Sequence, residues 1–184
     1  LLNLLMFLYV DRLDPDLQRS FQYLHGLIPA RYMRPDWAAQ SGFPDDFTPF
    51  ITSMFMHGSW LHLIFNLWLL WIFGDNIEDA FGHGWFLLVY LFTGVVGSLL
   101  QVMLMPGSPI PTIGASGAVS GVMGAYFVLF PRARVLTLIP IFFFIRLIYL
   151  PAPLLLGFWI LIQVLNGCGS VPGTGGGVAY FAHI

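Results

Sequence analysis

The chain contains few charged residues and no lysine. Charged side chains make up 9% of its 184 residues, whereas soluble domains contain roughly 25%. Without lysine, and with a net charge of −2, the chain lacks the basic surface that binds nucleic acid, so no such partner is expected. Cys168 is the single cysteine, which excludes an internal disulfide and a four-cysteine metal site. The hydrophobic share of 58% is typical of an integral membrane protein that contacts the lipid bilayer.

Long apolar runs recur along the chain and predict transmembrane helices. A helix needs about 20 residues to cross a bilayer, and most of the runs at 60–73, 84–105, 113–130 and 135–165 approach that length. The expected fold is therefore all-α, a polytopic transmembrane helical bundle in one membrane domain over 1–184. LLNLLMFLYV at the start and VAYFAHI at the end are shorter than a span. We interpret them as parts of a first and a last helix that are both truncated, so that the domain is incomplete at both ends.

Charged residues and prolines predict where the spans begin and end. Ten of the sixteen charged residues fall within 11–50, which indicates a long polar connection, called loop 1 below. Prolines interrupt 135–165, so we divide this run into an interfacial segment and a span. The expected elements after loop 1 are a second span from Trp60, a third from Trp85 to Met105, a fourth from Ile113, the interfacial segment to about 150, a fifth span over 152–165, a glycine-rich loop over 166–177 and a sixth span from Val178.

Four polar residues are expected at one depth in the membrane. The second, fourth and sixth spans enter from the same side, because consecutive spans alternate in direction. At 1.5 Å per residue, His62, Asn66, Ser116 and His183 all lie roughly 5–10 Å below that surface. Ionisable residues inside a membrane usually face the bundle interior and mark a functional site. The shared depth therefore indicates a functional site. We expect the glycine-rich loop to cap this site.

Each of these residues also has a structural explanation when taken alone. Gly117, Gly121 and Gly124 lie in a small-residue pattern that lets transmembrane helices pack closely. His62 or Asn66 alone could form hydrogen bonds between helices, and His183 alone could be a hydrogen-bonded core residue. Packing does not require these groups to share one level, so the site is the favoured interpretation. His57 precedes the break at Gly58 and is expected to anchor the end of loop 1 instead.

The residue types at this level favour a Ser-His dyad without a cofactor. No HExxH motif is present, so a metal site is poorly supported. Position 118 is alanine, so the G-x-S-x-G motif of α/β-hydrolases is absent. No Asp or Glu follows Asp79, so the later spans offer no acid for a Ser-His-acid triad. At a helix start, Ser116 has free backbone N–H groups beside it that can bind an oxyanion.

Three motifs together resemble the rhomboid intramembrane serine proteases. They are GASG at 114–117, the H-x4-H-x3-N pattern of His57, His62 and Asn66, and the closing AH at 182–183. The resemblance implies a six-helix core with Ser116 as nucleophile and His183 as general base. It also implies that His62, Asn66 and the Ser116 backbone N–H contact the oxyanion. Gly114 and Gly117 flank the Ala115-Ser116 pair and are expected to keep the approach open for a substrate backbone.

By the same resemblance, the expected activity is cleavage of membrane-anchored proteins near the end of a transmembrane segment, in a plasma or inner membrane. Some rhomboids carry a tyrosine four residues after the nucleophile, under the histidine ring. This chain has Ser120 there, so the ring must be held in another way. Two alternatives stay open: an inactive relative that binds transmembrane helices, and a transporter. The transporter is disfavoured because its polar site would lie near the membrane midplane.

Overall fold

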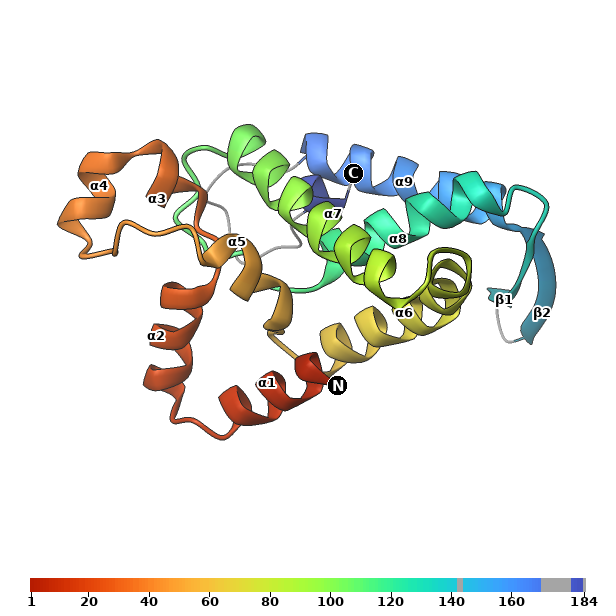
Figure 1. The fold of residues 1–184 in the computed structure, drawn as a ribbon, viewed down its shortest axis with the longest axis horizontal. Helices are drawn as coiled ribbons and strands as arrows, with labels where there is room; N and C mark the ends of the chain where they lie inside the picture. Colours follow the sequence, from red (N-terminus) through yellow and green to blue (C-terminus); the bar gives the residue numbers. More distant parts are fainter. Residues whose placement is uncertain (142–143, 170–179, 184) are drawn as a thin grey trace.

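Four long helices form the body of the molecule, and short helices precede them (Figure 1). The computed structural model describes residues 1–141, 144–169 and 180–183. The long helices are α6 (Trp60–Phe81), α7 (His83–Leu104), α8 (Ser116–Leu129) and α9 (Ala152–Gly169). The other elements are α1 (Leu2–Asp11), α2 (Pro15–His25), α3 (Pro29–Met33), α4 (Pro35–Gln40), α5 (Pro49–Thr52), the 3-10 turns η1 (Ser53–Phe55) and η2 (Tyr180–His183), and the strands β1 (Arg134–Ile141) and β2 (Phe144–Pro151).

The helices expected from Trp60 and Trp85 are confirmed. α6 begins after Ser59, whose hydroxyl accepts the backbone N–H of His62 at 3.2 Å and so caps the helix. Gly82, with φ 78°, ends α6 and turns the chain directly into α7. Within the described part of the chain, only α7 is by itself long and apolar enough to cross a bilayer. A second crossing is obtained if 49–55 and α6, which meet at 95°, count as one bent span.

Residues 134–141 and 144–151 form the two strands of a β-hairpin, which corrects the expectation of an all-α fold with an interfacial segment here. β1 and β2 pair antiparallel, with Arg134 opposite Pro151 and Ile141 opposite Phe144. This stretch is rich in β-branched and aromatic residues, which favour strands. Pro140 would also interrupt a helix, whereas it is tolerated in a strand with an unpaired edge. The fold is therefore predominantly helical with one hairpin, which projects from one end of the bundle (Figure 1).

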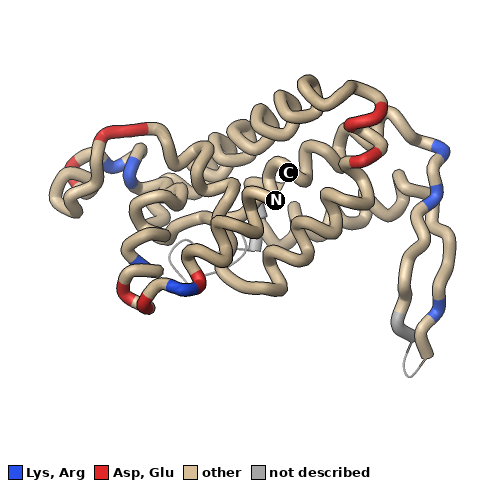
Figure 2. Tube along the Cα trace, turned by 60° about the horizontal axis from the view of Figure 1, so that its bottom comes forward, with Lys and Arg blue, Asp and Glu red and all other residues tan. Residues whose placement is uncertain are grey.

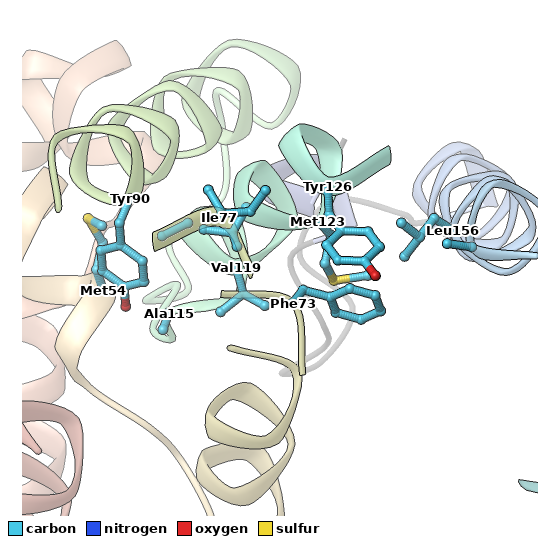
Figure 3. Packing of buried hydrophobic residues seen from close by; sticks show 12 residues of the cluster. Met54, Phe73, Ile77, Tyr90, Ala115, Val119, Met123, Tyr126 and Leu156 are labelled. Atoms are coloured by element: carbon cyan, nitrogen blue, oxygen red, sulfur yellow. The ribbon is translucent and has the colours of Figure 1, made fainter. Parts of the chain in front are cut away.

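α8 lies at the centre of the helical core (Figure 3). Its buried residue Val119 belongs to one cluster with Phe73 of α6, Tyr90 of α7 and Leu156 of α9. Glycines bring the helices together: a Cβ at Gly121 of α8 would fall within the side chain of Thr93 of α7. Gly117 and Gly121 of the small-residue pattern therefore make close contacts from the helix that begins with Ser116, whereas a Cβ at Gly124 would meet nothing within 4 Å.

Charged side chains lie at the two ends of the bundle and leave its middle uncharged (Figure 2). One group belongs to the N-terminal helices of loop 1. The other consists of the acidic residues in the last turns of α6 and the arginines at 132, 134 and 146, around the hairpin. α7, α8 and α9 contain no Asp, Glu or Arg. An uncharged belt between two charged ends matches the hydrocarbon layer of a bilayer.

Loop 1 is joined by backbone hydrogen bonds to the segment that precedes Ser116. Leu27 and Thr112 exchange two bonds, at 3.0 and 2.8 Å, and the N–H of Ala30 donates to the carbonyl of Ser108 at 3.0 Å. The N–H of Gly114 donates to the carbonyl of Ser53 in η1 at 2.9 Å. The polar N-terminal region thus fixes the chain just before the start of α8.

Arg31 is a buried residue whose hydrogen bonds join two parts of loop 1. Its side chain is 2% exposed, and Nη2 donates to the carbonyl of Pro44 at 2.6 Å and to Oδ2 of Asp46 at 3.0 Å. Oδ1 of Asp46 accepts the backbone N–H and the hydroxyl of Thr48, at 2.8 and 2.7 Å. The hydrogen bonds from Thr48, together with the Arg31 guanidinium, hold the pKa of Asp46 below its ordinary value of 3.8.

This low pKa predicts an acid-sensitive contribution of Asp46 to stability. A carboxyl whose folded pKa is depressed stabilises the fold above its unfolded pKa, and that contribution is lost as pH falls through the folded value. We therefore expect Asp46→Asn to melt at a lower temperature than wild type at pH 6. The gap should narrow once pH drops below 3.8. Thermal melts of both proteins in detergent, from pH 6 to pH 2, measure this, and a gap independent of pH would contradict the assignment.

Candidate functional site

Ser116 and His183 are joined by a short hydrogen bond. Ser116 is the first residue of α8, and its Oγ lies 2.6 Å from Nε2 of His183 in η2. The structure thus brings the two residues of the expected Ser-His dyad within hydrogen-bond distance. The backbone N–H groups in the first turn of a helix have no partner within the helix, and the positive end of the helix dipole lies among them. The hydroxyl therefore stands beside a position suited to negative charge.

Two glycines let η2 approach α7 and α8 closely enough to make this bond. A Cβ at Gly97 of α7 would stand 2.6 Å from the carbonyl oxygen of Ala182, and one at Gly117 of α8 would stand 3.0 Å from the same atom. Real Cβ atoms essentially never come within 3.0 Å of such an atom. The backbone next to His183 thus rests directly on two helix backbones, so the place of the imidazole is set by main-chain contact.

The far side of the His183 ring is held by α9. Nδ1 of His183 lies 2.9 Å from Oε1 of Gln163, and both side chains are buried. The ring also stacks on Trp159, with the centroids 6.0 Å apart and the planes at 23°. Neither Gln163 nor Trp159 belongs to the motifs in the sequence. One signal does point to Gln163, because the other residues of 152–165 are aliphatic, aromatic, glycine or proline.

His62 and Gly114 meet beside the Ser116 hydroxyl. Gly114 has a φ of 131°, which disfavours any other residue. A Cβ there would stand 2.6 Å from Cε1 and Nε2 of His62 and 3.6 Å from Oγ of Ser116. The edge of the His62 ring therefore occupies the space that a side chain at 114 would take, next to the hydroxyl. The structure thus brings His62 to the dyad, as expected.

Asn66 lies one turn further along α6 and is also buried. Its Nδ2 donates to the carbonyl of His62 at 2.9 Å. An amide nitrogen carries two N–H groups, so this bond uses one of them. His57 is buried too: its Nε2 accepts the N–H of Ala115 at 3.5 Å, and its ring centroid lies 5.0 Å from that of His62. His57 therefore contacts the site, while its expected role at the end of loop 1 stays a prediction.

The expected capping loop over 166–177 lies mostly outside the described residues, which stop at 169 and resume at 180. The residues at 166–169 belong to the end of α9. Among the described residues, no group of three His, Cys, Asp or Glu side chains could hold a metal ion. The site as described is built from serine, histidine, asparagine and glutamine.

Comparison with known proteins decides the family. The sequence model of the Rhomboid domain family matches residues 44–184 of this chain. This chain belongs to the rhomboid family. It is therefore an integral membrane protein with a predominantly helical rhomboid domain.

Rhomboid relatives are found in bacteria, plants and animals. Rhomboid protease GluP of Bacillus subtilis is 34% identical over 129 residues, covering 69% of this chain and 24% of GluP. Rhomboid-like protein 11, chloroplastic, of Arabidopsis thaliana is 43% identical over 72 residues, covering 39% of this chain and 25% of that protein. The mouse presenilin-associated rhomboid-like protein, mitochondrial, is 32% identical over 100 residues, covering 53% of this chain and 26% of its own length.

This rhomboid chain spans about a quarter of the length of the curated relatives it matches. Two of these three relatives are named as chloroplastic or mitochondrial proteins. Their names give no support to the plasma (inner) membrane expected from the sequence, so that location stays a prediction.

Proposed function

We propose that this chain forms the catalytic part of an intramembrane serine endopeptidase that cleaves membrane-anchored proteins near the end of a transmembrane segment. The observation that carries the proposal is the 2.6 Å contact between Oγ of Ser116 and Nε2 of His183 at the start of α8. In this proposal residues 1–184 act as one membrane domain with a six-helix core. The name of the GluP relative, a rhomboid protease, supports the same activity.

The dyad would work by nucleophilic catalysis with His183 as the base. Nε2 of His183 takes the hydroxyl proton as Oγ of Ser116 forms a bond to the scissile carbonyl carbon, and the carbonyl electron pair moves to oxygen. When that pair returns, the C–N bond breaks and Nε2 gives its proton to the leaving amine. Water then repeats the sequence on the ester, giving its proton to Nε2, and Oγ recovers the proton as the carboxylic acid leaves. The reaction needs water and no cofactor.

The start of α8 supplies the oxyanion contacts in this mechanism. The backbone N–H groups of Ser116 and Gly117 lie in its first turn, where no helical carbonyl can accept them. The His62 ring stands beside the hydroxyl, and the second N–H of Asn66 Nδ2 is available from α6. Fixed donors aimed at a developing negative charge are usually the largest single contribution to catalysis of this kind.

Labelling with a fluorophosphonate tests the nucleophile. We expect the full-length protein, reconstituted in liposomes, to form a covalent adduct on Ser116 that mass spectrometry locates. Ser116→Ala should abolish labelling, and His183→Ala should slow it strongly because the hydroxyl loses its base. Labelling that persists in Ser116→Ala would contradict the assignment. If the protein binds a single-span membrane protein tightly but cleaves none, this result would favour the inactive relative instead.

Asn66→Ala tests the side-chain contribution to the oxyanion site. We expect kcat to fall by about 10²-fold, the usual order for losing one such donor, with KM nearly unchanged. The measurement is steady-state cleavage of a dye-labelled single-span protein in liposomes. Asn76→Ala provides a matched control, because Asn76 also donates to the carbonyl four residues back, that of Ile72, but is exposed and lies at the other end of α6. A normal kcat in Asn66→Ala would leave Asn66 with a packing role only.

A further inference from the structure

We propose that Gln163 of α9 is a positioning residue that selects the active tautomer of His183. This inference rests on the proposed Ser-His chemistry and adds a third member to it. Nδ1 of His183 lies 2.9 Å from Oε1 of Gln163, and Nε2 lies 2.6 Å from Oγ of Ser116. The two ring nitrogens are thus each committed to one partner, on opposite sides of the ring.

The tautomer follows from which atom Gln163 presents. A neutral imidazole carries one proton, so one nitrogen donates and the other accepts. An oxygen facing Nδ1 can only accept, so the proton stays on Nδ1 and the lone pair on Nε2 faces the Ser116 hydroxyl. If the amide nitrogen faced Nδ1 instead, the proton would move to Nε2 and Ser116 would have no base. The role therefore requires an acceptor at 163, and a carboxylate would serve as well as an amide oxygen.

Burial protects the bond between Gln163 and His183, and a second side chain of α9 orients the imidazole ring. Gln163 and His183 are 8% and 9% exposed, so water does not compete freely for the bond. Trp159 lies one turn earlier on α9, on the same face as Gln163, and stacks on the imidazole. Together these two side chains orient the ring from α9, which explains how it is held in a chain that carries Ser120 in α8. The Ser120 hydroxyl bonds within its own helix, donating to the carbonyl of Ser116 at 2.7 Å.

Two substitutions separate positioning from packing. Gln163→Met keeps a long unbranched side chain but has no strong acceptor, whereas Gln163→Glu in its ionised form offers only acceptor atoms. We expect Gln163→Met to lower both kcat for a dye-labelled single-span substrate and the rate of fluorophosphonate labelling by at least about 10-fold, since a general base contributes 10²–10⁴-fold. KM should stay unchanged, because Gln163 contacts His183 on the side of the ring away from Ser116. Gln163→Glu should restore the labelling rate to within a few-fold of wild type.

The controls distinguish the possible failures. Gln101→Met makes the same change at a buried glutamine of α7 and should leave the labelling rate within a few-fold of wild type. Thermal melts show which variants fold; if Gln163→Glu does not, the comparison of folded Gln163→Met with wild type decides. Wild-type labelling on Ser116 with equal labelling of Gln163→Met would overturn the positioning role and leave the proposed function intact. No labelling of wild type on Ser116 would overturn the proposed function, and the positioning role with it.

Discussion

Ser116→Ala is expected to lower kcat for a membrane-anchored substrate by at least about 10⁴-fold, because covalent catalysis is lost along with the group that His183 activates. Substrate affinity should change little, since one oxygen atom is removed from a residue whose backbone stays at the start of α8. The measurement is single-turnover cleavage of a dye-labelled single-span protein in liposomes, read by gel over several hours. Residual cleavage sets the background of any contaminating protease.

Ser120→Ala is the matched control for this experiment. Ser120 lies one turn later on α8, and its hydroxyl donates to the carbonyl of Ser116 at 2.7 Å. A helical serine bonded to the carbonyl four residues back contributes little to stability, so cleavage should stay within a few-fold of wild type. Equal activity in Ser116→Ala and wild type would refute the nucleophile, whatever Ser120→Ala does.

Gly97→Ala is expected to reduce cleavage by about 10²-fold, the lower end of the 10²–10⁴-fold range that a general base contributes. The added methyl group would stand 2.6 Å from the carbonyl oxygen of Ala182, and ordinary contact begins at 3.4 Å. The backbone of η2 must therefore retreat by about 0.8 Å, taking His183 away from Ser116. A misplacement of about 1 Å is enough to cost a factor of 10².

Gly124→Ala makes the same change where there is room. Gly124 lies within α8, and nothing stands within 4 Å of its added Cβ. Because alanine favours a helix over glycine by about 1 kcal/mol, this variant should melt at the same or a higher temperature and cleave normally. Full activity in Gly97→Ala would show that η2 adapts to the methyl group and would refute backbone contact as the device that places His183.

That His62 and Ser116 lie at similar depths could be predicted from the sequence, because depth follows from the rise per residue of a helix. Counting residues inward from Trp60 and Ile113 places His62 and Ser116 at similar levels, and α6 does begin at Trp60, where Ser59 caps it. α8 begins at Ser116, three residues after the expected start at Ile113, and 113–115 lie before the helix. This shift moves the serine to the helix terminus, where the free N–H groups are.

Gln163 and the hairpin could not be predicted, for different physical reasons. α9 is apolar around almost its whole circumference, so its sequence does not tell which face turns inward. Residues 134–139 and 144–151 carry apolar side chains on both faces of the hairpin, and Leu138, Leu147 and Ile148 are all exposed. Without alternation of polar and apolar residues, a strand cannot be distinguished from a helix by its period.

Because η2 docks on α7 and α8, the pair of Ser116 and His183 can form only late in the synthesis of the chain. Ser116 and His183 are separated by 67 residues, and synthesis proceeds at roughly 5–20 residues per second. A nascent chain therefore carries the serine for several seconds before the ribosome has added the histidine. During that interval Ser116 lacks the base that the proposed mechanism requires. In the proposed mechanism, Ser116 gains its base only once the carbonyl of Ala182 rests on Gly97 and Gly117.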